Sequence, residues 1–257
     1  MSDMWGALDA ELDAWRAAGR TATFWWRDDD AVADTLALHR LRELRRSLDV
    51  PLTLAVIPQP AEPGLAAALA GEGGVAVVQH GWAHRNHAAA GRRKCELGAD
   101  RPVASVAAEL MQGRARLDAL FPGRHLPMLV PPWNRIAPGV VDRLPALGYR
   151  GLSTFKARSR AEIRPGLVAA NAHIDIIDWA RTRAFAGTGA ALDAAVSHLV
   201  WRRTGAAGID PDEPTGLLTH HLAHDEASWE FIADFVARTA GRPAARWLAA
   251  AEVFGAA

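Results

Sequence analysis

The chain has 257 residues, of which 50% are hydrophobic and 23% are charged, and 29 basic residues balance 29 acidic ones. This length suits one α/β domain with a sizeable core, so we expect a single domain over residues 1–257. The balanced charge argues against a nucleic-acid partner and against a disordered chain. The lone Cys95 excludes an internal disulfide framework.

Residues 1–20 carry four acidic side chains and lack the basic start and apolar stretch of a secretory signal. No later run approaches the ~18 apolar residues that a membrane-spanning helix requires. The sequence therefore predicts a cytoplasmic protein with no membrane partner. It does not indicate an oligomeric state.

Apolar segments with strand character alternate with amphipathic segments of helical length. The expected strands lie at 22–26, 52–57, 75–78, 128–130, 151–154, 167–177 and 217–219. The expected helices lie at 34–48, 103–120, 138–147, 190–201 and 228–239. Such alternation favours a parallel sheet, and about seven units fall short of the eight that close a barrel. We expect an α/β fold, a distorted and incompletely closed (β/α) barrel of about seven parallel strands.

Three segments with metal-binding or acid–base chemistry each end an apolar run: 27–30, 80–84 and 217–221. Parallel strands open their carboxyl ends toward one face, so these segments should converge in one pocket. His80 and His84 are four residues apart, a spacing that puts both imidazoles on one side of a helical turn, and imidazole is a common zinc ligand. A pair at this spacing, taken alone, more often forms hydrogen bonds than binds a metal.

Asp28, Asp29 and Asp30 follow the apolar residues 24–26 directly. Three adjacent carboxylates repel one another and lose solvation unless a cation or an arginine compensates them, and the alternative is a solvated turn. Two histidines and one aspartate would leave metal positions open for water and substrate, as catalysis requires. A second carboxylate could then take a proton from water, and His220 could donate one to a leaving group.

In this order the segments resemble the five motifs of the NodB-homology polysaccharide deacetylases, the family-four carbohydrate esterases. Residues 27–31 are similar to the first motif, Thr-Phe-Asp-Asp-Gly. The resemblance implies that Asp29 is the general base and Asp30 a metal ligand, with a one-residue shift to Asp28 and Asp29 as the alternative. Residues 80–84 resemble the second motif, His-Ser-x-x-His, which implies that His80 and His84 are metal ligands.

The third motif, Arg-Pro-Pro-Tyr-Gly, is similar to residues 130–134. The resemblance implies that the backbone N–H of Trp133 helps to stabilise the oxyanion, and we place Pro132 and Asn134 in the substrate pocket. The motif's arginine pairs with an aspartate in the family, but Val130 stands here. We expect Arg27 or Arg135, both assigned to the pocket, to fill that gap.

Residues 175–179 resemble the fourth motif, which implies that Asp178 is a catalytic tether and Trp179 a pocket wall. Residues 218–220 match the fifth, Leu-x-His, which implies that His220 is the acid. Further polar residues lie beside the motifs. We place His173 in the substrate pocket, although it and His221 are equally compatible with support of the ligands or with surface positions, and we expect surface positions for His87, His224 and Asp225.

The resemblance implies a metal-dependent hydrolase that removes an N- or O-acetyl group from a carbohydrate or sugar conjugate. The cofactor would be one divalent ion, with zinc favoured. The expected cytoplasmic location favours a small soluble glycan or another acylated small molecule. Two alternatives remain: a catalytically silent glycan-binding protein, suggested by Val130 and Asn134 at the motif's arginine and glycine positions, and a hydrolase of non-sugar acyl amides on the same fold.

Overall fold

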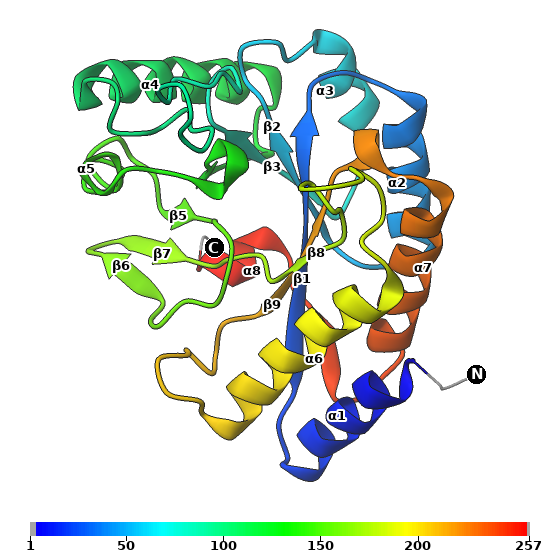
Figure 1. Cartoon of the computed structure of the whole chain (residues 1–257). Helices are drawn as coiled ribbons and strands as arrows, with labels where there is room; N and C mark the ends of the chain where they lie inside the picture. The colour runs from blue at the N-terminus through cyan, green and yellow to red at the C-terminus, as the bar shows by residue number, and fades with distance from the viewer. Residues whose placement is uncertain (1–3, 256–257) are drawn as a thin grey trace.

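A ten-stranded, mostly parallel sheet organises the chain (Figure 1). The computed structural model describes residues 4–255. The strands are β1 (Ala22–Ala31), β2 (Leu52–Val56), β3 (Val75–His80), β4 (His125–Val130), β5 (Gly151–Leu152), β6 (Glu162–Arg164), β7 (Leu167–Ala169), β8 (Ile174–Asp175), β9 (Thr215–Thr219) and β10 (Ala245–Trp247). Their order is β6-β7-β5-β4-β3-β2-β1-β9-β8, and β10 pairs with the start of β1.

The helices surround this sheet (Figure 1). They are α1 (Gly6–Ala17), α2 (Leu36–Ser47), α3 (Pro63–Leu69), α4 (Val103–Leu120), α5 (Pro138–Val141), α6 (Thr188–Thr204), α7 (Glu226–Ala240) and α8 (Ala250–Phe254), with short 3₁₀ turns η1 (Pro132–Asn134) and η2 (His221–Ala223). No helix within residues 4–255 is long and apolar enough to cross a membrane.

The sheet is not closed by hydrogen bonds, because the strands at its two ends, β6 and β8, do not pair with each other. This confirms the expected α/β fold with an incompletely closed, mostly parallel sheet. There are more strands than the seven expected. The expected strand 167–177 is divided into β7 and β8, since Asn171 between them donates its backbone N–H to the Glu213 side chain instead of to a neighbouring strand. The short β6 and β10 had no clear sequence signal.

One expected helix is much shorter than predicted. The segment 138–147 forms a helix only over α5, and turns follow up to Gly148. Pro145 accounts for this, because its ring disfavours helical backbone at the preceding residue and it has no N–H to donate. By contrast, α4 spans residues 103–120 as expected.

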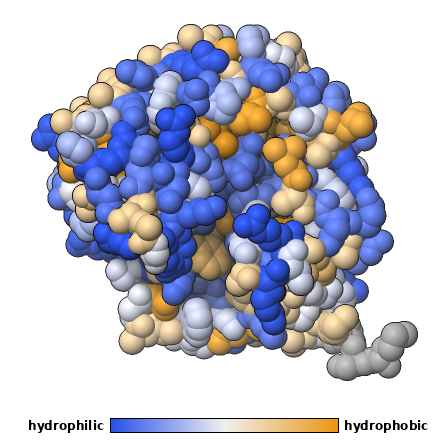
Figure 2. Space-filling view, turned by 45° about the horizontal axis from the view of Figure 1, so that its top comes forward, coloured by the Kyte–Doolittle hydropathy of each residue, from blue (hydrophilic) through white to orange (hydrophobic). Residues whose placement is uncertain are grey.

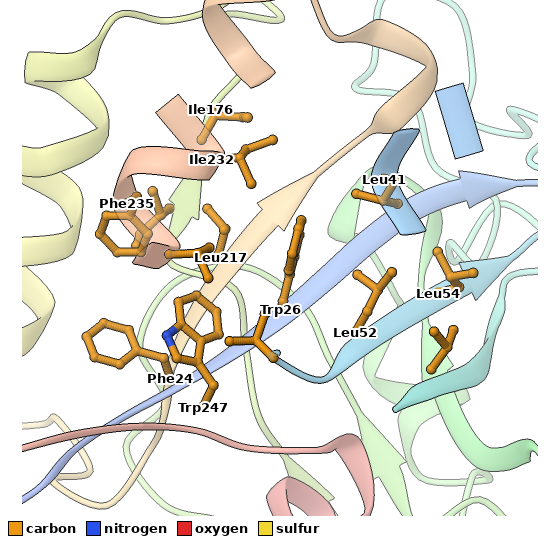
Figure 3. Packing of buried hydrophobic residues seen from close by; sticks show 14 of the residues in the cluster. Phe24, Trp26, Leu41, Leu52, Leu54, Ile176, Leu217, Ile232, Phe235 and Trp247 are labelled. Atoms are coloured by element: carbon orange, nitrogen blue, oxygen red, sulfur yellow. The ribbon is translucent and has the colours of Figure 1, made fainter. Parts of the chain in front are cut away.

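The packing of the core fixes the position of β1 and so of the polar residues at its carboxyl end. Successive side chains of a strand point to opposite faces. Phe24 packs edge-on against Phe235 of α7, and Trp26 belongs to the same cluster (Figure 3), whereas Trp25 meets Phe254 of α8 on the other side of the strand. Both faces of β1 are therefore buried, and the charged residues that follow Trp26 emerge from the middle of the fold.

Candidate active site

A pocket of about 820 Å³ lies where the carboxyl ends of several parallel strands meet. Figure 2 brings this end of the molecule forward and shows that hydrophilic side chains cover much of it. The pocket is lined by Asp29, Asp30, His80, His84, Arg93, Lys94, Trp133, Asn134, Arg135, Phe155, Lys156, Asp175, Trp179, Ala180, Arg183 and His220. The three polar segments singled out in the sequence thus converge in one place.

Asp30, His80 and His84 form a group whose candidate ligand atoms all lie within 4.8 Å of one another. Asp30 Oδ1 lies 3.1 Å from His80 Nε2 and 3.4 Å from His84 Nε2. Adjacent ligands at about 2.1 Å from a shared ion are about 3.0 to 3.4 Å apart, so these separations fit a single divalent ion.

Two further observations fit a metal at this group. Asp30 Oδ1 is buried and accepts no hydrogen bond from any described residue. His80 Nδ1 lies 3.0 Å from the carbonyl of Val130 and donates to it, which leaves the Nε2 lone pair facing Asp30. Burial alone would raise the pKa of Asp30, but the close contact with His80 and the charges of His80, His220 and His84 lower it, so the carboxylate is ionised.

A β-bulge turns Asp30 toward the histidines. The register of β1 against β2 shifts between Asp28 and Ala31, and Asp30 has a φ of 70°. In a regular strand Asp29 and Asp30 would point to opposite faces, whereas a bulge re-aims one side chain. Two adjacent carboxylates therefore line the same pocket.

The segment that holds His84 is not helical, so the expected helical turn between His80 and His84 is wrong. His80 ends β3, and His84 follows in a loop with a φ of 54°. Glu96 organises this loop, because its fully buried carboxylate accepts the backbone N–H groups of Trp82, Ala83 and Arg85 at 2.8 to 3.2 Å. The sequence analysis missed Glu96, whose only signal is a carboxylate beside the apolar Leu97.

Arg27 is the arginine that contacts Asp29. Its Nε lies 2.9 Å from Asp29 Oδ1 and its Nη2 donates to Asp29 Oδ2 at 3.0 Å, a two-pronged ion pair between residues on the same face of β1. Arg27 also donates to Ser153 Oγ, to the Thr154 carbonyl and to Asn134 Oδ1. Arg27 is fully buried and does not line the pocket, which corrects its assignment as a pocket residue.

Asp28 points away from the pocket, into a buried network. Its Oδ2 accepts from Thr219 Oγ1 at 2.6 Å and from the backbone N–H of His221, and its Oδ1 accepts from His221 Nδ1 at 2.5 Å. The carboxylate is fully buried, so the solvated turn considered as an alternative is wrong. Asp28 instead ties β1 to the segment after β9, and His221 is a structural partner of this carboxylate.

The turn η1 brings Trp133 and Asn134 to the pocket. Both residues have positive φ, 56° and 57°, which tightens the turn after Pro132. The Trp133 ring lies 4.4 Å from the His84 ring, centroid to centroid. Pro132 itself is buried and is not among the lining residues, contrary to expectation. Arg135 does line the pocket, and its guanidinium donates to the Lys94 carbonyl.

His220 enters the pocket after β9 and meets Trp179, whose ring lies 4.7 Å away in an edge-on arrangement. Asp175 accepts from Trp179 Nε1 at 3.0 Å and lines the pocket beside His220. Burial raises the pKa of Asp175, although the charge of His220 opposes this.

Asp178 does not line the pocket; it holds the turn that follows, accepting the backbone N–H groups of Ala180 and Arg181. In the structure Asp175, three residues earlier, lines the pocket and accepts from Trp179, the residue expected to form the pocket wall.

His173 lies in a second buried group, with His198 and Glu213, and not in the substrate pocket as expected. His173 Nδ1 accepts the backbone N–H of Gly216, so the proton of the neutral ring is on Nε2, which lies 3.3 Å from Glu213 Oε2. Burial, with Arg202 and other arginines nearby, lowers the pKa of His173 to about 3. The Nδ1 lone pair of His173 is therefore taken up by Gly216, and Nε2, which makes no hydrogen bond within the described chain, faces Glu213.

The three residues expected at the surface are exposed or half-buried. Asp225 is exposed and caps α7 by accepting from Ser228, and His87 is half-buried in its loop. His224 is half-buried like His87, but its Nε2 accepts the backbone N–H of His220, and burial lowers its pKa to about 4. It therefore supports the residue that enters the pocket.

No family model matches the sequence, and no curated protein aligns with it significantly. Solved structures do resemble the fold. A Mycobacterium smegmatis protein assigned to the polysaccharide deacetylases gives a TM-score of 0.64 at 16% identity, covering 93% of this chain and 91% of that one. A family 4 acetyl xylan esterase from Clostridium thermocellum, in complex with a cobalt ion, gives 0.53 at 14% identity, with 91% of each chain covered.

A variant of BA3943, a family 4 pseudoenzyme with restored enzymatic activity, gives a TM-score of 0.57 at 14% identity and covers 91% of this chain and 68% of that one. The chain therefore has the NodB-like fold of the polysaccharide deacetylases of carbohydrate esterase family 4. This confirms the fold expected from the motifs.

Proposed function

We propose that this protein is a metal-dependent deacetylase that removes an N- or O-acetyl group from a carbohydrate or sugar conjugate. The observation that carries the proposal is the joint placement of two aspartates: Asp30 faces His80 and His84, and Asp29, paired with Arg27, lines the same pocket. The fold shared with deacetylases of carbohydrate esterase family 4 supports it.

Asp30, His80 and His84 would hold the divalent ion, for which zinc is our first choice because two imidazoles and one carboxylate suit it. When bound, such an ion polarises the acetyl carbonyl and lowers the pKa of water. The cobalt ion of the structurally similar acetyl xylan esterase is consistent with a divalent metal at this fold.

The residues of the chain divide the proton transfers between them. Asp29 accepts the proton that the attacking water loses, and Arg27 keeps its carboxylate oriented for that transfer. The backbone N–H of Trp133 donates a hydrogen bond to the developing oxyanion. His220, from the far end of the chain, donates a proton to the departing amine or alkoxide, with Trp179 and Asp175 beside it.

The silent-binder alternative was suggested by Val130 and Asn134, which replace the motif's arginine and glycine. The contacts of Arg27 weaken both grounds: it supplies a guanidinium to Asp29, and Asn134 accepts from the same guanidinium at 2.7 Å. Because the fold also resembles that of a family 4 pseudoenzyme variant, a measurement of turnover must distinguish the deacetylase from the silent binder.

The test combines two readouts on the wild type, Asp29→Asn and His84→Ala. Metal content is measured by elemental mass spectrometry on protein purified without added metal or chelator, and acetate release is measured on acetylated sugars. We expect about one equivalent of metal in the wild type and in Asp29→Asn, little in His84→Ala, and turnover in the wild type alone. Metal in the wild type without turnover on any acetylated sugar would favour the silent binder.

A parallel screen separates the sugar substrates from simple N-acyl amides. N-acetylglucosamine oligomers, acetylated xylan fragments and N-acetylated alkylamines are compared at equal concentration. Faster acetate release from the amides than from every sugar would replace the carbohydrate proposal with the acyl-amide hydrolase, in which the same metal ligands and base act.

A further inference from the structure

The walls of the pocket carry an excess of positive charge. Five cationic side chains line it: Arg93, Lys94, Arg135, Lys156 and Arg183. The chain as a whole is balanced, with 29 basic and 29 acidic residues, so this concentration is local.

The acidic side chains of the pocket do not neutralise these cations. Asp29 is paired with Arg27 beneath the pocket, and Asp30 faces the two histidines of the metal group. Asp175 accepts from Trp179 Nε1 and from the backbone N–H of Ile177. A bound divalent ion at the Asp30 group would add further positive charge.

Three of the cations gather at one side, around Trp133. Arg135 donates to the backbone carbonyl of Lys94, and the Lys94 ammonium lies 6.0 Å from the centre of the Trp133 ring. Arg93 is close enough that its charge, after burial, lowers the pKa of Arg135. No carboxylate among residues 4–255 pairs with Arg93, Lys94 or Arg135, so three like charges stand together beside the pocket.

The other two cations, Lys156 and Arg183, stand on unusual backbone. Lys156 and Arg183 have φ values of 84° and 54°, in the left-handed region that costs a non-glycine residue about 1 kcal/mol. Backbone hydrogen bonds hold both conformations: Lys156 donates to the Ala172 carbonyl and Arg183 to the Asp178 carbonyl. Neither side chain pairs with a carboxylate of the described chain.

We propose that the acetylated substrate carries an anionic group, a carboxylate or a phosphate ester, and that Arg93, Lys94 and Arg135 bind it beside Trp133. This proposal rests on the proposed deacetylase function and specifies its substrate class. A pocket lined by one sign of charge attracts the opposite sign and raises its local concentration. Guanidinium and ammonium groups form strong charge-assisted hydrogen bonds to carboxylate and phosphate oxygens. An uncharged sugar would offer no opposite charge to the exposed Arg93 and Lys94 or to the half-buried Arg135.

The experiment compares three sugars that share one acetamido group: the neutral methyl glycoside of N-acetylglucosamine, N-acetylglucosamine 6-phosphate, and the corresponding 6-carboxylate. Initial rates of acetate release give kcat/KM for metal-loaded wild type, for Arg93→Gln/Lys94→Gln, and for Arg16→Gln/Arg143→Gln. The last variant removes the same charge from two exposed arginines outside the pocket.

We expect at least one anionic sugar to exceed the neutral one about 10-fold in kcat/KM at low salt. Its advantage should shrink as salt is raised, because screening weakens exposed charge interactions. The Arg93→Gln/Lys94→Gln variant should lose about 10-fold on the anionic sugar and less than about 2-fold on the neutral one, with no change in the control. The better anionic sugar identifies carboxylate or phosphate as the recognised group. Equal rates for neutral and anionic sugars, or equal losses on both, would overturn the proposal.

A second measurement distinguishes failure of the deacetylase proposal from failure of the anionic-substrate proposal. If none of the sugars releases acetate, the same three are titrated into the same proteins by calorimetry, which needs no turnover. Tighter binding of an anionic sugar that weakens only in Arg93→Gln/Lys94→Gln supports the charge assignment without the activity. The charge assignment is contradicted if no sugar binds, if neutral and anionic sugars bind equally, or if the variant binds the anionic sugar as tightly as the wild type does. The variant keeps all three metal-group residues, so a direct contact between phosphate and metal would persist in it and cannot explain a loss of binding.

Discussion

The ion pair between Arg27 and Asp29 allows a quantitative test of the buried end of β1. Both side chains are almost entirely excluded from solvent, at 0% and 3% exposure, and two separate contacts join them at 2.9 and 3.0 Å. The substitution Arg27→Met keeps much of the side-chain volume and removes the charge. It leaves the Asp29 carboxylate buried without its partner, and it also removes the donors to Ser153 and Asn134.

Removing one member of a buried ion pair costs about 3 to 5 kcal/mol, because the remaining charge is uncompensated. This is a large part of the roughly 5 to 15 kcal/mol by which native proteins are stable. The double variant Arg27→Met/Asp29→Leu removes both charges and should be less destabilised than Arg27→Met alone. We expect a coupling free energy of about 2 kcal/mol or more between the two sites.

The assay is urea unfolding followed by tryptophan fluorescence and circular dichroism, on the wild type, both single variants and the double variant. Each free energy of unfolding is extrapolated to water with its own slope, so that a change of slope is seen. A cost below about 1 kcal/mol for Arg27→Met, or effects of the two substitutions that simply add, would refute the reasoning that this pair is a desolvated, mutually dependent unit.

Three further predictions concern the surroundings of the pocket. Gly81→Ala should lower the free energy of unfolding by more than about 1 kcal/mol in urea titrations, because φ is 56° and the new Cβ would overlap Glu96 Oε2 and Pro132. Glu96→Gln should weaken metal affinity about 10- to 100-fold in chelator competition, since the loop before His84 loses a carboxylate acceptor while every metal-group residue remains; unchanged affinity would contradict this supporting role. His224 has a folded-state pKa lowered from 6.5 to about 4, so its contribution to stability is present above pH 6.5 and is lost as pH falls toward 4, by about 3 kcal/mol. His224→Gln should therefore show a shallower loss of unfolding free energy between pH 7 and 4, and equal slopes in the two proteins would exclude that contribution.

The sequence predicted the fold and the convergence of the site because both depend on strong patterns. Alternating strands and helices indicate a parallel sheet, and polar residues at strand ends then meet at one edge. His80, His84 and Asp30 were accordingly expected together, and the structure places them together. Their roles as metal ligands remain a prediction.

Other features depend on geometry that one sequence does not show. The bulge that turns Asp30 beside Asp29 is a register shift between β1 and β2, which periodicity cannot reveal. The partner of Asp29 was left open between Arg27 and Arg135, and only the packing shows that Arg27 contacts it.

His173 was expected in the substrate pocket but does not line it. Its position beside the fourth motif suggested the pocket, yet its ring accepts a hydrogen bond from the backbone N–H of Gly216 in β9 and is buried beside Glu213. Polar residues near a strand are ambiguous in this way, because a shift of a few residues along the strand separates the open end of a sheet from its buried middle.

The distribution of the pocket along the chain has a consequence for biosynthesis. Asp29, Asp30, His80 and His84 all belong to the first third of the sequence, whereas Asp175 and His220 come from β8 and the segment after β9. Since β9 is the neighbour of β1 in the sheet, the strand that carries Asp29 is flanked on that side only once Thr215–Thr219 has been made. A ribosome synthesises a protein from its N-terminus onward, so N-terminal segments leave it first. The growing chain therefore contains the candidate metal group long before the histidine that faces it, and the two halves of the pocket meet only after His220 has been made.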